Sequence, residues 1–220
     1  MKKTFFYFFA VLFLGSLFLA SCEPKSNVDS NKDQTEQPND STGVIPDEPK
    51  DTTSNDYEPI VLPEGTIRLQ ALKSEYNLAS NLQISGATHS FLLMFATEEC
   101  EVIYGTPFGN GKVLVMDLFS ETAENLLPAE GIYKIEEAIQ DGSITAGFDM
   151  MGVPIGTYVQ NMVDGEFVSH DFIVSGAVEI KKGKADDEVD IFVYAVFEDG
   201  SEANYYYGGK LLITDYSVEE

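Results

Sequence analysis

The sequence predicts an all-β domain over residues 61–216, folded as a single antiparallel β-barrel or β-sandwich of about 8–11 strands. Apolar and polar residues alternate with a period of two in several segments, and Gly, Pro and Asp separate these segments at intervals typical of all-β domains. The strongest single signal is the dipeptide Asp199-Gly200, which favours a tight hairpin turn between two runs rich in β-branched and aromatic residues.

The strands beside Asp199-Gly200 contain three tyrosines that are candidate ligand contacts. If the dipeptide is a two-residue loop, Glu198 pairs with Ser201. Counting outward then places three tyrosines on one face of the hairpin: Tyr194, Tyr205 and Tyr207. A three-residue loop with a glycine bulge shifts the register by one residue, so both registers stay open. The tyrosines either line a pocket or sugar-stacking platform, or pack within the sheet.

The other strands follow from the same period of two. Long segments are expected at 88–97, 112–119 and 172–181, and shorter ones at 66–72, 100–104, 132–136, 143–148 and 157–162. Residues 120–127 and 135–139 are each predicted to form a helical turn. Three strands follow a proline and a glycine, because proline fixes φ for a turn and glycine adopts the positive φ that often comes next.

The N-terminal residues 1–21 have the features of a lipoprotein signal peptide. Lys2 and Lys3 precede an apolar run, which ends in Leu19-Ala20-Ser21-Cys22 with small residues at a cleavage point. This ending is similar to a bacterial lipobox, in which a peptidase cuts before Cys22 and the thiol carries diacylglycerol. The run is shorter than the roughly 20 residues of a membrane helix. We therefore expect a lipid anchor at Cys22 that attaches the chain to a membrane.

Residues 22–60 are predicted to form a disordered acidic linker, because polar residues and proline dominate and large apolar residues are nearly absent. The formal net charge of −24 disfavours binding to nucleic acid. Acylation of Cys22 leaves Cys100 as the only other cysteine, so no intramolecular disulfide is expected.

Few residues of the sequence are suited to catalysis. The two histidines, His89 and His170, lie in no metal-ligand spacing, and His170 and its neighbour Asp171 point to opposite faces of a predicted strand. The acidic residues 186–190 lack the glycine-punctuated spacing of a calcium loop and are expected at a solvated hairpin end. We predict a protein that is not an enzyme and uses no cofactor or metal, with a hydrolase built on paired carboxylates as the remaining catalytic alternative.

Four motifs follow one another along the second half of the chain: LPAEGIYKI at 127–135, GTY at 156–158, SGAVEI at 175–180, and EDGS followed by YGG within 198–209. Their order resembles a group of Bacteroidota lipoproteins of unknown function with the pattern LPxGxYxI, GxY, SGxVxI and DGxxxxxxYxG. Here Glu130 is an extra residue, and the last motif ends in Tyr-Gly-Gly. The resemblance implies a small β-barrel or β-sandwich, described in some members as calycin-like, whose mouth holds an apolar ligand.

These features predict a cell-envelope lipoprotein that serves as a non-catalytic binding module for a small apolar or glycan ligand, with Tyr194, Tyr205 and Tyr207 as contacts. The alternative is a structural or interaction protein, such as a pilus-like assembly subunit, that presents a sheet edge to a partner protein of unknown identity. The anchor is expected in the outer membrane, and both its periplasmic and its surface face remain open.

Overall fold

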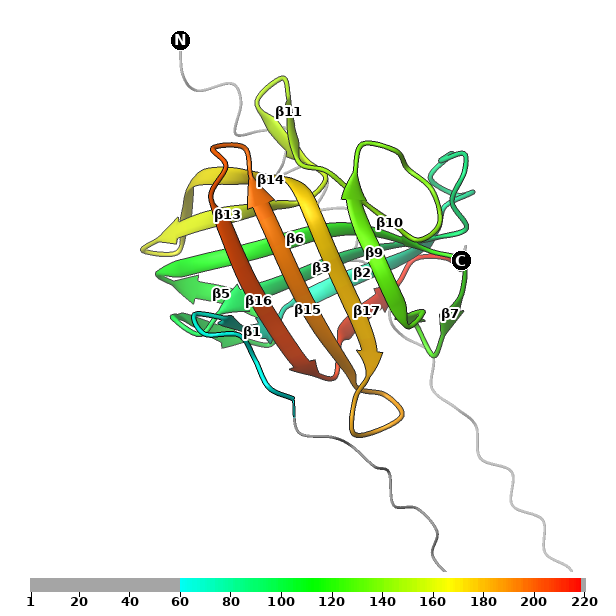
Figure 1. The fold of residues 1–220 in the computed structure, drawn as a ribbon, viewed down its shortest axis with the longest axis horizontal. Coiled ribbons are helices and arrows are strands. Elements are labelled where there is room, and N and C mark those ends of the chain that lie inside the picture. Colours follow the sequence, from blue (N-terminus) through cyan, green and yellow to red (C-terminus); the bar gives the residue numbers. More distant parts are fainter. Residues whose placement is uncertain (1–59, 219–220) are drawn as a thin grey trace, which may run out of the picture. The chain divides into compact units, whose positions relative to one another are not determined.

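A computed structural model describes residues 60–218, and this part of the chain is all-β, as predicted (Figure 1). The described residues form strands, turns and bends and contain no helix. The predicted signal peptide, Cys22 and residues 22–59 of the predicted linker lie outside the described residues.

The strands are numbered along the chain. Their bounds are β1 (Ile67–Ala71), β2 (Lys73–Leu78), β3 (His89–Thr97), β4 (Cys100–Ile103), β5 (Thr106–Gly109), β6 (Gly111–Ser120), β7 (Ala123–Glu124), β8 (Leu127–Pro128), β9 (Gly131–Glu136), β10 (Ser143–Thr145), β11 (Phe148–Met150), β12 (Val153–Ile155), β13 (Tyr158–Val163), β14 (Glu166–Lys182), β15 (Val189–Phe197), β16 (Glu202–Gly209) and β17 (Leu212–Asp215).

Eleven strands form one hydrogen-bonded sheet in the order β13-β6-β10-β9-β14-β15-β16-β1-β3-β2-β17. Two further pairings, β6 with β3 and β13 with β14, connect strands that are distant in this order and close the sheet on itself. Strands β9, β14, β15 and β16 form a front layer that crosses β2, β3 and β6 behind it (Figure 1). The predicted barrel or sandwich is thus present as one closed sheet with two crossing layers.

The sheet is mixed, which corrects the prediction of a wholly antiparallel one. Strand β1 runs parallel to β16, β10 to β9 and β17 to β2, and the other pairings are antiparallel. Two parallel neighbouring strands cannot be joined by a tight hairpin. The turn residues of the sequence therefore indicate only which strands pair in antiparallel fashion. Closure of the sheet brings β1 beside β16, and no local pattern encodes that contact.

One apolar core lies inside the closed sheet. On β3 the inward side chains Phe91, Leu93 and Phe95 are fully buried, and they belong to the same cluster as Ile191 and Val193 of β15. Complete burial of a side chain of this size contributes about 1.5–3 kcal/mol. These packed side chains occupy the interior of the sheet.

The β15–β16 hairpin has a three-residue loop, so the pairings predicted for a two-residue loop are wrong. The Phe197 N–H donates to the Ser201 carbonyl at 2.9 Å, and the Gly200 N–H donates to the Phe197 carbonyl at 2.9 Å. Gly200 has a φ of +82°, the left-handed conformation that the glycine of such a loop adopts. The register of the whole hairpin shifts by one residue as a result.

The helical turn predicted at 120–127 is also wrong, because this segment leads into the small β7–β8 hairpin. Its two turn residues, Asn125 and Leu126, have φ values of +52° and +60°. Positive φ at both central positions makes a tight hairpin turn. Asn tolerates this conformation, but Leu rarely adopts it. The residue types at 125 and 126 therefore did not indicate a hairpin turn. Residues 135–139 cover the end of β9 and a bend.

Candidate functional site

The three tyrosines predicted to contact a ligand do not come together. Tyr205 and Tyr207 face the interior and are 3% and 6% exposed. The Tyr207 hydroxyl donates a hydrogen bond to the backbone carbonyl of Lys210. Tyr194 lies on the outer face and is 42% exposed. The one-residue register shift is the cause, since successive side chains of a strand point to opposite faces.

Tyr205 is the predicted contact that the structure places at a surface depression. This hollow, of about 640 Å³, lies beside the loop of the β15–β16 hairpin and is also lined by Lys112, Asp171 and Phe197. Burial, and then the Asp171 carboxylate, raise the pKa of Tyr205 to about 12. Its hydroxyl therefore stays protonated at neutral pH and is available as a hydrogen-bond donor.

A second depression, of about 350 Å³, combines apolar walls with carboxylates. Asp117 of β6 and Glu75 of β2 line it. Its apolar and aromatic wall includes Leu92, Val115, Ile155, Tyr158 and Tyr216, which come from five separate segments. An apolar hollow with a few polar groups is typical of small-molecule sites. We refer to it as the Asp117 pocket and take it as the candidate site.

The alternation of β6 places Asp117 on the outer side of the sheet. Its sequence neighbours Met116 and Leu118 belong to the interior core, whereas Val115 belongs to a smaller apolar cluster outside it. Asp117 follows Val115 on this outer side and stands opposite Leu92 of β3. A carboxylate therefore occupies a position whose neighbours are apolar.

Asp117 is poorly compensated electrostatically. Burial raises the pKa of its carboxyl from the ordinary 3.8 to about 6. The Thr145 hydroxyl donates a hydrogen bond to Asp117 Oδ2 at 3.4 Å, a long distance for such a bond. The described side chains that line the pocket include no Lys, Arg or His. A perturbed carboxyl in a hollow of this kind is a mark of functional sites.

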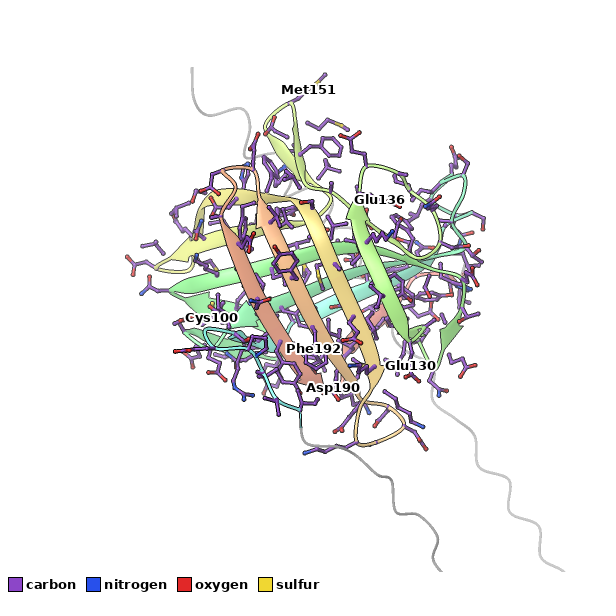
Figure 2. All side chains as sticks on the ribbon, in the orientation of Figure 1. Cys100, Glu130, Glu136, Met151, Asp190 and Phe192 are labelled. Carbon is purple, nitrogen blue, oxygen red and sulfur yellow. The ribbon has the colours of Figure 1, made fainter. Side chains whose placement is uncertain are left out.

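Two backbone features position the pocket walls. Gly156 follows β12 with a φ of +76°, as its turn sequence predicts, and a Cβ there would lie 2.3 Å from the Ala146 carbonyl oxygen. Glycine therefore lets the base of the β11–β12 hairpin pack against the backbone of Ala146, while Met151 at the hairpin tip projects outward (Figure 2). The Tyr216 N–H donates to the Tyr76 carbonyl at 2.9 Å and holds Tyr216 beside β2.

Sequence reasoning missed this site, although one signal was present. The predicted strand 112–119 reads KVLVMDLF and contains a single carboxylate within an otherwise apolar run. The alternation shows that Asp117 faces away from Met116 but not what covers it. Tyr158 and Tyr216 are distant in sequence from Asp117, and only the fold brings them to the same hollow.

The acidic cluster 186–190 is only in part the solvated hairpin end that the sequence predicts. Asp187 is paired with Lys210, and both side chains are exposed. Asp190, in contrast, is 3% exposed and accepts a hydrogen bond from the Tyr206 hydroxyl at 2.7 Å. Asp190 and Phe192 lie on β15 in the front layer (Figure 2). Asp190 is a structural residue of this layer.

The remaining polar candidates lie elsewhere in the domain. Cys100 is buried, and burial raises the pKa of its thiol. His89 Nδ1 lies 2.8 Å from the Tyr76 hydroxyl. Residues 60–218 contain no cluster of three or more His, Cys, Asp or Glu side chains placed to hold a metal ion. The same residues contain no helix long and apolar enough to cross a membrane.

Comparisons of the chain with protein-family models, with curated proteins and with solved structures produced no match in any of the three.

Proposed function

We propose that this chain is a cell-envelope lipoprotein, anchored in the outer membrane through a lipid on Cys22, that serves as a non-catalytic binding module for a small apolar or glycan ligand. The lipobox-like ending at Cys22 supports the anchor. The Asp117 pocket is the observation that carries the binding role.

The pocket joins apolar contact area and hydrogen-bond acceptors in one hollow. Leu92 and Ile155 supply apolar contacts, and the rings of Tyr158 and Tyr216 provide surfaces on which a sugar or an apolar ring packs. Asp117 accepts hydrogen bonds. The volume of about 350 Å³ suits a small ligand. Since packed side chains occupy the interior of the sheet, we place the ligand in this outer pocket and not in a barrel mouth.

Methyl NMR on the full-length chain in detergent tests this proposal, with a panel of monosaccharides and small apolar compounds as probes. We expect shifts of the Leu92, Val115 and Ile155 methyl signals. Tyr216→Ala should weaken binding about fivefold, because an aromatic contact contributes roughly 1 kcal/mol. Tyr194→Ala, an exposed tyrosine on a different face, is the matched control and should change nothing. Shifts that instead gather at the Tyr205 depression contradict the assignment.

An interaction role is the second candidate, and one open strand favours it. The first half of β14 pairs with β13, and among the described residues no second strand pairs with 166–171. Phe167 and Val168 in this segment are 54% and 59% exposed. An open, apolar strand edge can accept a strand from a partner protein.

A charge on this edge tests the interaction role. Val168→Lys is expected to remove complexes captured by cross-linking in intact envelopes, because a lysine on an edge strand opposes strand addition. Tyr194→Lys is the matched control, since Tyr194 is 42% exposed but pairs with Ala177 of β14 on one side and with Asn204 of β16 on the other. Identical cross-linked species in the wild type and both variants would exclude the edge as a docking site.

A further inference from the structure

We infer that the ligand of the Asp117 pocket carries a protonated amine, which pairs with the Asp117 carboxylate while the tyrosine rings of the pocket pack around the cation. The inference rests on the proposed binding function and adds to it the chemical class of the ligand.

The charge of Asp117 favours a cationic ligand. A carboxylate removed from water loses its hydration, and a neutral hydroxyl compensates only a fraction of that loss. The Thr145 hydroxyl oxygen lies 3.4 Å from Asp117 Oδ2, whereas the Asp190 carboxylate accepts a much shorter hydrogen bond of 2.7 Å from the Tyr206 hydroxyl. A protonated amine in the pocket would donate a charge-assisted hydrogen bond to Asp117 and also neutralise it. A neutral sugar would leave the charge in place.

The aromatic lining of the pocket favours an organic cation. Tyr158 and Tyr216 reach the pocket from β13 and from the segment after β17. The ring of Tyr76 on β2 instead packs into the interior core, 5.0 Å from the ring of Phe91, and adds no aromatic face to the pocket. Organic cations are attracted to the faces of such rings, and a set of aromatic rings beside a carboxylate is suited to an ammonium group. The whole chain, with a formal net charge of −24, also attracts cations in preference to anions.

A metal ion fits the pocket less well than an organic cation. Asp117 and Glu75 are its only two carboxylates among the described lining residues. Calcium requires about six to eight oxygen ligands, and apolar and aromatic side chains form most of the remaining wall. The lining therefore offers contact area to a carbon skeleton and few ligands to a bare ion.

The arrangement makes binding dependent on pH. Asp117 becomes neutral as the pH falls through about 6, and a neutral carboxyl no longer pairs with the amine. The other titratable groups around it are Glu75 from β2, Tyr158 from β13 and Tyr216 after β17. His170 of β14 lies next to Tyr158, with ring centroids 6.5 Å apart. Replacement of Asp117 alone separates its titration from that of these groups.

Two probes of the same shape test the inference on the full-length chain in detergent: phenethylammonium and the neutral 2-phenylethanol. At about pH 7.5 we expect the ammonium to bind at least about tenfold more tightly than the alcohol, as measured by methyl NMR titration. Asp117→Asn should remove this preference. At about pH 5 the wild type should bind the ammonium about tenfold more weakly than at neutral pH, and Asp117→Asn should show no such change.

Asp164→Asn is the matched control for charge. Asp164 is an exposed turn residue with a φ of +53°, a conformation that Asn tolerates, and it follows the end of β13 opposite to Tyr158. This variant should keep the wild-type preference for the ammonium. A preference lost equally in Asp117→Asn and Asp164→Asn would show that overall charge attracts the probe, and would overturn the inference.

The outcomes separate the two proposals. Equal affinity for the ammonium and the alcohol at the Leu92 and Ile155 methyls overturns the amine inference and leaves the binding function standing. Displacement of the ammonium by millimolar Ca²⁺ at constant ionic strength overturns it in favour of a metal site. If neither probe, nor any sugar of the panel, shifts these methyl signals, both the inference and the proposed binding function are wrong.

Discussion

At the scale of single residues, Asp117 opposes folding at neutral pH. Its pKa is about 6 in the folded chain and near the ordinary 3.8 in the unfolded chain. Between these values Asp117 binds more protons in the folded state than in the unfolded state, so its own contribution to the free energy of unfolding becomes more favourable as the pH falls from about 7 towards 4. The difference in pKa corresponds to a cost on the order of 3 kcal/mol at neutral pH. Retention of a costly group is common at functional sites.

Replacement of this carboxyl by a neutral amide should stabilise the fold. We expect Asp117→Asn to raise the free energy of unfolding by about 1–3 kcal/mol at neutral pH, because the desolvated charge is removed. The gain should shrink as the pH approaches about 4, where the wild-type carboxyl is already protonated in the folded state. Urea denaturation at the two pH values measures it. A gain of the same size at both would contradict the assigned cause.

Tyr207 stabilises the core. Tyr207→Phe should lower the free energy of unfolding by about 1 kcal/mol, because the Lys210 carbonyl loses the hydrogen bond from the buried hydroxyl. Tyr104→Phe is the control, since Tyr104 is 90% exposed and its loss of a hydroxyl should be neutral. Urea denaturation measures both variants. Unchanged stability of Tyr207→Phe combined with weaker ligand binding would restore the predicted binding role.

At the scale of elements, the β15–β16 hairpin shows how one additional loop residue changes the face of the sheet on which candidate site residues lie. Asp199-Gly200 correctly indicates the position of the hairpin, but the loop contains three residues. Because the register is shifted by one residue, Tyr194 lies on the outer face and Tyr205 on the inner face. Loop length depends on how the strand ends pack, and the dipeptide is compatible with both lengths. The alternation of each strand was predictable, and the face that each strand turns to the core was not.

Gly200 should be sensitive to substitution for conformational reasons alone. Its φ is +82°, and a Cβ there would meet no atom within 4 Å. Gly200→Ala should therefore cost about 1 kcal/mol of stability, the penalty of placing a side chain in the left-handed region. Gly200→Asn should cost less, because Asn adopts this conformation more readily. Equal stability of the wild type and Gly200→Ala in thermal unfolding would argue against the left-handed conformation of Gly200.

At the scale of the whole molecule, charge repulsion dominates over ion pairing. The formal net charge is −24, and the ion pairs found in the described residues, such as Lys181 with Glu179 and Lys182 with Asp186, are exposed. Exposed pairs contribute little, whereas the excess of carboxylates favours the expanded unfolded chain. Salt should therefore act on this fold mainly through screening of repulsion.

Added salt should accordingly raise the melting temperature. We expect the Tm to increase between about 10 mM and 500 mM NaCl, because the Debye length falls from about 30 Å to a few ångströms and repulsion is screened. KCl should give the same increase, since screening depends on ionic strength and not on the identity of the cation. A Tm that falls with either salt would show that ion pairs, and not repulsion, control stability.

The all-β class, most strand positions and the turn glycines could be predicted from the sequence, because alternation and turn chemistry are local and each needs only a few neighbouring residues. The parallel pairing of β1 with β16, the face of the sheet on which each tyrosine lies, and the Asp117 pocket follow from the folded arrangement alone. Each of these depends on contacts between segments distant in sequence, which form only when the sheet closes.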